Sequence, residues 1–314
     1  MEQLQIVDRV RTREATPWPE LIDAIAEILT KHDGQAPDRH VHPVGLPGGT
    51  DGALLVMPSW IEGDVIGVKT VTYVPTNRGT DVPTINASFQ LFDGHNGRLL
   101  AVIDGYELTA RRTAAISALA ARRLARPDGS RLLVMGTGQV APNVARAYAA
   151  SRDLTRIEVW GRDPDAAAAT AAELASEGLP AIATDNPERA AAEADIVSCA
   201  TGATSPIVRG DWLSPGTHLD LIGSFQHDMR ESDDDAVVGA SVFVDTMAGA
   251  VLSGDLAQPL QSGVLNEDDI QADLRDLLTA RHTGRRNDAE RTVFKSAGFA
   301  LADLAAARLV TRSF

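Results

Sequence analysis

Hydrophobic and polar positions follow two different patterns along this chain. Between residues 131 and 200, short apolar runs alternate with Ala-rich segments that have helical spacing. The apolar runs are 131–135, 156–160, 180–184 and 195–200, and the helical segments are 139–151, 164–176 and 187–193. This alternation predicts a doubly wound α/β domain built on a parallel sheet, with further strands at 218–223 and 241–245.

The chain before residue 131 has a different organisation. An amphipathic helix is predicted over 18–30, and a long helix over 106–126. Apolar runs at 53–57, 65–74, 87–92 and 99–103 are separated by turn residues, which predicts antiparallel strands. Residues 1–16 give no clear pattern, 37–44 are expected to be extended or a loop, and 267–281 are expected to be irregularly helical. The chain therefore begins with a β-rich α+β unit that precedes the α/β domain. A last apolar helix is predicted over 299–310, after the α/β domain.

Composition narrows the classes of function. The chain has 314 residues, 44% of them hydrophobic, and a formal net charge of −14. The negative charge argues against a nucleic-acid partner, because phosphate binding needs a basic face. We expect a cytoplasmic protein with no membrane segment, since no apolar run is long enough to span a bilayer and the first residues lack a signal-peptide pattern. The single cysteine, Cys199, precludes an intrachain disulfide.

The run from 131 to 150 contains the strongest motif. Gly136, Gly138 and Ala141 match the G-x-G-x-x-G/A fingerprint between a predicted strand and a predicted helix. The first glycine permits a tight turn, the second lets backbone approach a pyrophosphate, and the alanine keeps the helix close to the strand. The helix N-terminus adds free N–H groups and a positive dipole end. We therefore predict a dinucleotide site here.

The residue at the end of the second strand of such a unit selects between the two nicotinamide dinucleotides. Here that strand ends in Gly161-Arg162-Asp163. An arginine accommodates the 2′-phosphate of NADPH, which makes NADPH the expected cofactor. Asp163 follows directly and leaves NADH open, because an acidic side chain there would hold the ribose hydroxyl of NADH.

Lysine is rare in this chain, with only three among 29 basic residues. Lys69 and Lys295 both lie in apolar surroundings, which suggests that the ammonium group itself matters there, because an ammonium can give up a proton and a guanidinium practically cannot. Arg112 recurs with apolar residues on one face of its predicted helix, while Arg111 points elsewhere. Arg112 is thus expected to meet a ligand, the alternative being a packed aliphatic stem. His40 and His42 lack companion ligands, so no metal site is expected.

Several motifs together resemble the ornithine cyclodeaminase/mu-crystallin family. They are Gly67-Val68-Lys69, the run Thr109-x-x-Arg112-Thr113-Ala114-Ala115, the glycine motif, and Val293-Phe294-Lys295-Ser296-x-Gly298. The resemblance implies a homodimer with a nicotinamide cofactor held where two domains meet. It implies a substrate-binding and dimerisation domain of residues 1–119 plus 297–314, and a Rossmann domain of residues 120–296.

The resemblance also implies roles for individual residues. Lys69 matches the lysine at the reacting carbon, and Arg39 and Arg112 match arginines that hold a substrate carboxylate. The implied substrate-binding residues are Arg39, Met57, Lys69 and Arg112. The implied cofactor-binding residues are Thr84, Arg112, Thr113, Gly136, Gly138, Gln139, Val140, Ala141, Arg162, Thr201, Gly223, Ser224, Lys295 and Ser296.

Two departures argue against cyclodeamination. Cyclodeaminases resembling this chain carry a Glu where Leu55 stands, and an Asp in the slot of Phe225, with Asp228 three residues later. Without those acids the base that handles ornithine's amines is missing. The acidic run at Glu231 and 233–235 is expected to be solvated surface, and a role for His227 or Asp228 stays open.

The run 223–231 instead resembles the cyclic imine reductases of this family. Those enzymes reduce Δ1-pyrroline-2-carboxylate, and often its six-membered homologue, to L-proline and L-pipecolate. An oxidoreductase of this kind is therefore the expected function. The alternatives are an alanine-type amino-acid dehydrogenase, an ornithine cyclodeaminase, and a mu-crystallin-like NADPH-dependent ligand-binding protein.

Overall fold

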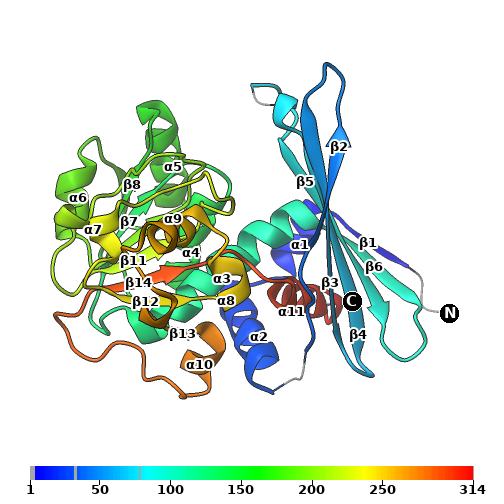
Figure 1. Cartoon of the computed structure of the whole chain (residues 1–314). Helices are drawn as coiled ribbons and strands as arrows, with labels where there is room; N and C mark the ends of the chain where they lie inside the picture. Colours follow the sequence, from blue (N-terminus) through cyan, green and yellow to red (C-terminus); the bar gives the residue numbers. More distant parts are fainter. Residues whose placement is uncertain (1–3, 32–33, 78, 314) are drawn as a thin grey trace. The chain divides into compact units, whose positions relative to one another are not determined.

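The structure is a computed structural model that describes residues 4–31, 34–77 and 79–313. The chain divides into two compact units, which Figure 1 shows with their helices and strands labelled. Unit 1 consists of Met1–Arg112 and Phe299–Phe314, and unit 2 of Thr113–Gly298. The ends of the expected first domain, at residues 1–3 and 314, lie outside the described residues.

Unit 1 is built on a six-stranded sheet in the order β1-β6-β5-β4-β3-β2. All neighbours are antiparallel except β1 and β6. Helix α11 packs against α2 and against strands β3, β4 and β5. The elements are β1 (Gln5–Val7), α1 (Arg9–Glu14), α2 (Trp18–Lys31), β2 (His40–Gly45), β3 (Asp51–Ile61), β4 (Val65–Tyr73), β5 (Ile85–Asp93), β6 (Leu99–Asp104), the start of α3 (Gly105–Leu124) and α11 (Ala300–Thr311).

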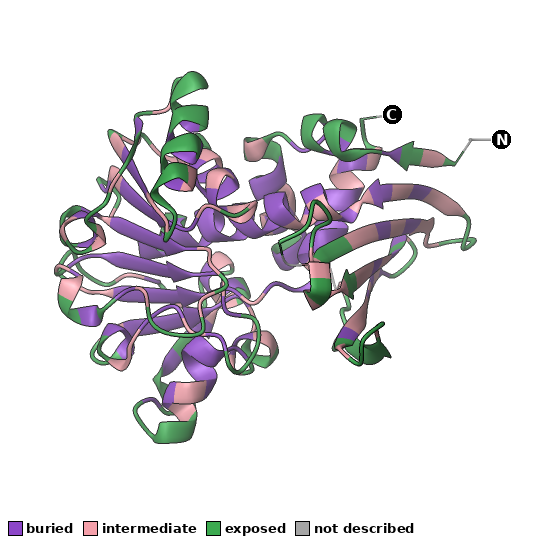
Figure 2. Cartoon of the chain, turned by 90° about the horizontal axis from the view of Figure 1, so that it is seen from above, coloured by how far each residue is buried: buried purple, intermediate pink, exposed green. Residues whose placement is uncertain are grey.

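Strands β3 to β6 of unit 1 each bury one face, whereas the edge strand β2 is exposed along its whole length. Along β4, Val65, Gly67 and Lys69 are buried while the residues between them are more exposed, as the period of two requires. Figure 2 shows this alternation as stripes along the long strands. Gly67 is needed for the packing of α11, because a Cβ there would lie 2.4 Å from Phe89 Cζ and 2.8 Å from Leu304 Cδ1.

Unit 2 is built on an eight-stranded sheet in the order β13-β12-β14-β11-β10-β7-β8-β9, and every neighbouring pair is parallel. The strands are β7 (Arg131–Met135), β8 (Arg156–Trp160), β9 (Ala181–Ala183), β10 (Ile196–Cys199), β11 (His218–Leu221), β12 (Ser241–Val244), β13 (Ile270–Asp273) and β14 (Thr292–Lys295). The helices after the end of α3 are α4 (Val140–Ser151), α5 (Pro164–Ser176), α6 (Pro187–Glu193), α7 (Asp234–Val237), α8 (Met247–Ala250), α9 (Gly254–Ser262) and α10 (Leu274–Leu278).

The strand order of unit 2 reverses between β7 and β10. Strands β8 and β9 extend the sheet to one side of β7, and β10 and β11 extend it to the other. Such a reversal is the switch point at which open α/β sheets bind ligands, outside the carboxyl ends of the strands. Strands β10, β11, β12 and β14 are buried along their whole length, as expected for a parallel sheet with both faces covered (Figure 2). The predicted fold class is confirmed.

The sequence predicts no membrane-spanning segment, and the helices of the structure bear on this point. None that the described residues form combines the length and the apolar character that a bilayer crossing requires.

Two sequence-based expectations were incomplete or wrong. Residues 1–16 gave no pattern, yet the described part of this segment forms β1 and α1. Residues 267–281 were expected to form a less regular helical region, but Ile270–Asp273 is a strand paired with β12, and only Leu274–Leu278 is α-helical. Both strands are very short and exist because a distant strand supplies their backbone partner, which local periodicity does not reveal.

Replacing Gly67 with alanine should destabilise the protein by about 1–3 kcal/mol, because the added methyl group overpacks the contact with Phe89 and Leu304. Thermal denaturation compared with wild type measures this. Gly45→Ala is the matched control, since a Cβ at Gly45 meets nothing within 4 Å and the change should stay within about 0.5 kcal/mol. Equal stability of the two variants would contradict the packing.

Candidate active site

The β4 strand places Lys69 inside unit 1. Lys69 is 2% exposed and pairs in register with Met57 of β3 and Phe89 of β5. Residues directly opposite one another in an antiparallel sheet point to the same face, so Lys69 lies among apolar side chains on the face that α11 covers. A buried ammonium in such surroundings requires a charged partner.

That partner is Asp303 of α11, which contacts two cations at once. Its Oδ2 accepts a hydrogen bond from Lys69 Nζ at 2.7 Å, and its Oδ1 accepts one from Arg112 Nε at 2.8 Å. Asp303 is fully buried, and the Lys69 and Arg112 side chains are 2% and 6% exposed. One carboxylate therefore joins a strand, the long helix α3 and the last helix of the chain.

The electrostatics of this cluster favour a bound anion. Burial, joined by the nearby guanidinium groups of Arg112 and Arg39, lowers the pKa of Lys69 to about 8, although Asp303 acts in the opposite direction. Burial alone would raise the pKa of Asp303, but Arg112 and Lys69 outweigh it and bring that pKa below its ordinary value. Lys69 and Arg112 thus share one carboxylate, whose single negative charge balances only one of these two cations.

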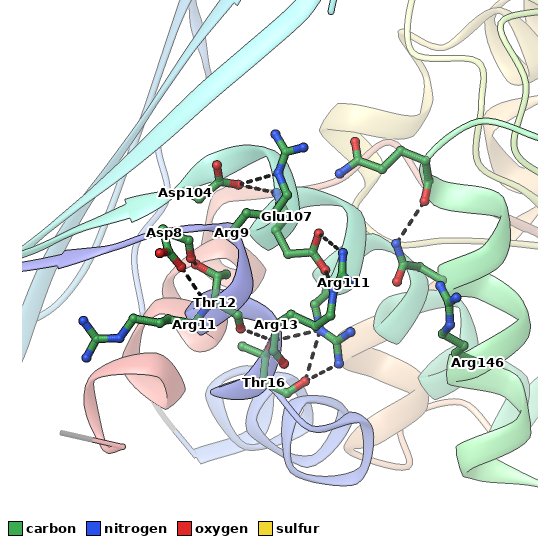
Figure 3. A network of polar contacts seen from close by, with 12 residues as sticks. Asp8, Arg9, Arg11, Thr12, Arg13, Thr16, Asp104, Glu107, Arg111 and Arg146 are labelled. Carbon is green, nitrogen blue, oxygen red and sulfur yellow. Dashed lines mark hydrogen bonds and ion pairs between the residues drawn. The ribbon is translucent and has the colours of Figure 1, made fainter. Parts of the chain in front are cut away.

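The two adjacent arginines of α3 point in different directions, as predicted. Arg112 turns to Asp303, whereas Arg111 donates to Thr16 Oγ1 at 2.8 Å and to the Thr16 carbonyl. Figure 3 shows Arg111 reaching Thr16 beyond α1. Its guanidinium also stacks on Trp18, 3.9 Å from the ring centroid. Both arginines are 5% exposed, so Arg111 is as buried as Arg112 and anchors α2 rather than facing solvent.

The glycine motif of unit 2 lies at the switch point of the sheet. Gly136 follows β7 with φ of 133°, and a Cβ there would lie 2.5 Å from the Ala200 carbonyl oxygen after β10. A side chain at Gly138 would meet nothing within 4 Å, which leaves its backbone open to a ligand. Ala141 is fully buried against the strand. The helix that starts at Val140 is not capped by the side chain of Gln139, so this geometry fits a dinucleotide pyrophosphate.

Arg162 and Asp163, which follow β8, differ in their contacts. Asp163 is the N-cap of α5, and its Oδ1 accepts hydrogen bonds from the amides of Asp165 and Ala166 at 3.0 and 3.4 Å. Its carboxylate is thereby engaged in helix capping. Arg162 is exposed directly beside it.

Glu231 holds two loops together at the carboxyl edge of the sheet. Its Oε1 accepts from the amide and the hydroxyl of Thr201, both at 2.7 Å, and its Oε2 accepts from the amide of Gly223 at 2.6 Å. Glu231 is fully buried, so the expectation that it belongs to a solvated acidic run was wrong. Burial, reinforced by nearby Asp255, raises its pKa to about 7.

Lys295 is fully buried at the end of β14. Its ammonium donates to Asp255 Oδ2 at 3.2 Å and to the Leu221 carbonyl at 3.1 Å. Asp255 in turn accepts from the amide of Glu231 at 2.7 Å, which joins this pair to the loop clamp. Lys295 therefore lies in a buried segment, as expected, but its ammonium is paired with the carboxylate of Asp255.

Two further residues expected at the cofactor are occupied within the protein. Ser296 is 1% exposed and donates to Asp245 Oδ2 at 3.1 Å. Ser224 is fully buried and donates to the Met229 carbonyl at 2.8 Å. Their hydroxyl groups shape the loops after β14 and β11.

The remaining expected site residues are distributed over both units. In unit 1, Met57 is buried beside Lys69, Arg39 and Thr84 are half-buried, and His40 and His42 are exposed on the edge strand β2. In unit 2, Thr113 is buried in α3. The loop after β11 exposes four consecutive residues, Phe225, Gln226, His227 and Asp228.

Sequence reasoning missed Asp303, the residue on which the cationic cluster depends. A signal was present, because Asp303 is the only acidic residue in an apolar, Ala-rich helix. The rule that singled out Arg112, a charge on a core-facing stripe, applies equally to this position. Asp255 offered no comparable signal, since its segment contains several polar residues.

Comparison with known proteins gives consistent results. The model of the ornithine cyclodeaminase/mu-crystallin family matches residues 3–314. The Delta(1)-pyrroline-2-carboxylate reductase of Paracoccus denitrificans is 38% identical over 304 residues, covering 94% of this chain and 92% of that protein.

Solved structures share the fold over nearly the whole chain. The Delta(1)-pyrroline-2-carboxylate reductase of Thermococcus litoralis, in complex with NADH and L-proline, aligns with a TM-score of 0.93 at 30% identity, covering 98% of this chain and 96% of that one. An archaeal alanine dehydrogenase dimer with bound NAD aligns with a TM-score of 0.90 at 26% identity, covering 98% and 95%. The chain belongs to the ornithine cyclodeaminase/mu-crystallin family.

Proposed function

We propose that this protein reduces a cyclic imine carboxylate, Δ1-pyrroline-2-carboxylate and its six-membered homologue, to L-proline and L-pipecolate. The observation that carries the proposal is the buried cluster of Lys69, Arg112 and Asp303, with Arg39 acting on Lys69. The chain is an oxidoreductase of C=N bonds that uses a nicotinamide cofactor, as its relatives with reductase activity and bound NADH support.

Within this proposal unit 1 supplies the substrate-binding groups. Arg39 and Arg112 hold the carboxylate, because guanidinium–carboxylate pairs fix orientation as well as providing charge. Lys69 keeps its proton at neutral pH, since its pKa is about 8, and it delivers that proton to the imine nitrogen. When bound, the nicotinamide cofactor supplies the hydride that the imine carbon accepts.

The absence of an acid at position 55 supports an imine rather than a diamine as substrate. Leu55 and Met57 are two residues apart on β3 and therefore point to the same face, and Met57 pairs with Lys69. A carboxylate at position 55 would lie near this cluster, where Leu55 offers only apolar surface. The amine-binding acid of a cyclodeaminase is thus replaced at this position.

We propose that unit 2, corresponding to the Rossmann domain expected at 120–296, holds NADPH. The open backbone at Gly138 and the uncapped start of α4 fit the pyrophosphate. Arg162 is exposed at the tip of β8 while Asp163 is engaged in capping, which supports a 2′-phosphate over a free ribose hydroxyl. Glu231 fixes the neighbouring loops at Thr201 and Gly223.

We further propose that unit 1 forms the interface of a homodimer. The sheet face opposite Lys69 carries a partly exposed apolar patch beside Gln90, and its residues, adjacent in register, are Pro58, Trp60, Ile66, Val68 and Phe92. An antiparallel sheet with one covered face usually has a polar outer face, and contiguous apolar surface indicates an interaction site. The dimeric state of the archaeal alanine dehydrogenase supports a second copy as the partner.

The function is tested by the oxidation of NADPH with Δ1-pyrroline-2-carboxylate, measured beside pyruvate plus ammonia. We expect rapid oxidation with the cyclic imine alone. Lys69→Ala should reduce kcat by roughly a hundredfold or more through loss of the proton donor, whereas Lys31→Ala, on the exposed end of α2, should not. Activity confined to pyruvate plus ammonia would instead identify an amino-acid dehydrogenase.

Arg162→Gln should raise KM for NADPH by roughly ten- to a hundredfold and leave KM for NADH nearly unchanged, because a charged hydrogen bond to the 2′-phosphate is lost. Steady-state kinetics with both cofactors measures the ratio. Arg209→Gln, an exposed arginine of the same unit, serves as control. A parallel loss with NADPH and NADH would rule out selection by Arg162.

Val68→Lys should convert the proposed dimer to a monomer, because dimerisation would bury an unpaired ammonium in the apolar patch, which costs free energy. Sedimentation velocity measures the mass. Thr72→Lys adds the same charge on the same strand, at a more exposed position, and should leave the mass unchanged. A dimer that persists in Val68→Lys places the interface elsewhere.

A further inference from the structure

Lys69 is surrounded by groups that disfavour its proton, with one exception. The strands on either side of it contribute Met57 and Phe89, which are apolar and buried. Helix α3 contributes Arg112 and the segment before β2 contributes Arg39, and both are cations that act on Lys69. Among the described residues whose charge acts on the ammonium, Asp303 of α11 is the one that opposes these effects.

We propose that Asp303 is a positioning residue whose carboxylate keeps Lys69 protonated at neutral pH and fixes it beside Arg112. The inference rests on the proposed function, because it concerns the proton that Lys69 gives to the imine. In that step the Lys69 N–H bond breaks and an N–H bond forms at the imine nitrogen, while the imine carbon accepts the hydride of the cofactor. The Lys69 amine then regains a proton from water.

The contacts of Asp303 support an electrostatic role toward Lys69 rather than a purely structural one. Its two oxygens are divided between Lys69 Nζ and Arg112 Nε at 2.7 and 2.8 Å, so one group sets the spacing of two cations that would otherwise repel each other. Because Asp303 is fully buried, little solvent screens this interaction. With Asp303 neutral, burial and two guanidinium groups would act on Lys69 without opposition, and the amine would lose its proton at lower pH.

The small number of lysines makes the protonation of Lys69 directly measurable. Incorporation of lysine labelled with 13C at Cε yields resonances from Lys31, Lys69 and Lys295 only, and Lys69→Arg assigns the one of interest. In the wild-type protein we expect this resonance to titrate near pH 8. In Asp303→Asn the midpoint should fall by about one to three pH units.

A second variant gives a shift of the opposite sign. Arg112→Gln removes a cation that lowers the Lys69 pKa, so the titration midpoint should rise. This pair of opposite shifts separates electrostatic control from general loosening of the structure, and it keeps the test valid if Asp303→Asn does not fold. Glu107→Gln is the matched control, because Glu107 is also buried in unit 1 and paired with an arginine, Arg13, as Figure 3 shows.

The consequence for the reaction is read from the alkaline limb of kcat/KM against pH, which reports groups in the free enzyme, the state in which the Lys69 midpoint is measured. The limb should move to lower pH in Asp303→Asn, as the Lys69 midpoint does, and Glu107→Gln should leave it in place. An unchanged Lys69 midpoint in Asp303→Asn, or an unchanged limb despite a shifted midpoint, would overturn the inference. Should wild type fail to reduce the imine, the proposed function fails, and the NMR titration still decides whether Asp303 controls Lys69.

Discussion

The structure of unit 1 depends on one buried carboxylate. Asp303 is separated by 234 residues from Lys69 and by 191 from Arg112. Its carboxylate partly neutralises these two buried cations, which would otherwise lack a negative partner in this contact. Leaving such a charge without its partner typically costs about 3–5 kcal/mol. The last helix of the chain is therefore more than a cover for the sheet, because it completes the electrostatics of the cluster.

Unit 2 applies the same principle to the loops at the carboxyl edge of its sheet. Buried acids accept hydrogen bonds from several loop amides: Glu231 binds Thr201 and Gly223, and Asp245 accepts from Thr246, Ala297 and Gly298. Burial raises the pKa of both carboxyl groups. These bonds hold the loops after β10, β11 and β14, while a Cβ at Gly138 would meet nothing within 4 Å.

Loops that buried carboxylates hold beside an open glycine turn suit a site that must fit one ligand shape. The loop after β7 carries the small residues Gly136 and Gly138, whereas its neighbours are held by carboxylates. Preorganised N–H groups need not rearrange when an anionic ligand binds, so less of the binding free energy is lost to ordering. Under the proposed function, unit 1 supplies the substrate-binding groups around Lys69 and unit 2 supplies the glycine turn for the cofactor, so the two ligands are held by separate elements.

By itself, the sequence determined the local features of this protein. The alternation of apolar runs and helical segments specified the parallel sheet, because strand and helix periods depend only on neighbouring residues. The glycine spacing located the turn after β7, and the inward face of Arg112 followed from helical geometry. Lys69 and Lys295 were recognisable as unusual because lysine is so rare in this chain.

Tertiary structure alone decided which charges meet. Nothing local distinguishes the buried Glu231 from the acidic residues that follow it, and the partners Asp303 and Asp255 come from elements distant in sequence. The strand β13 likewise exists only because β12 pairs with it. Periodicity specifies the face on which a residue lies, whereas the partner across that face is selected by long-range packing, and the protonation of a buried group depends on that partner.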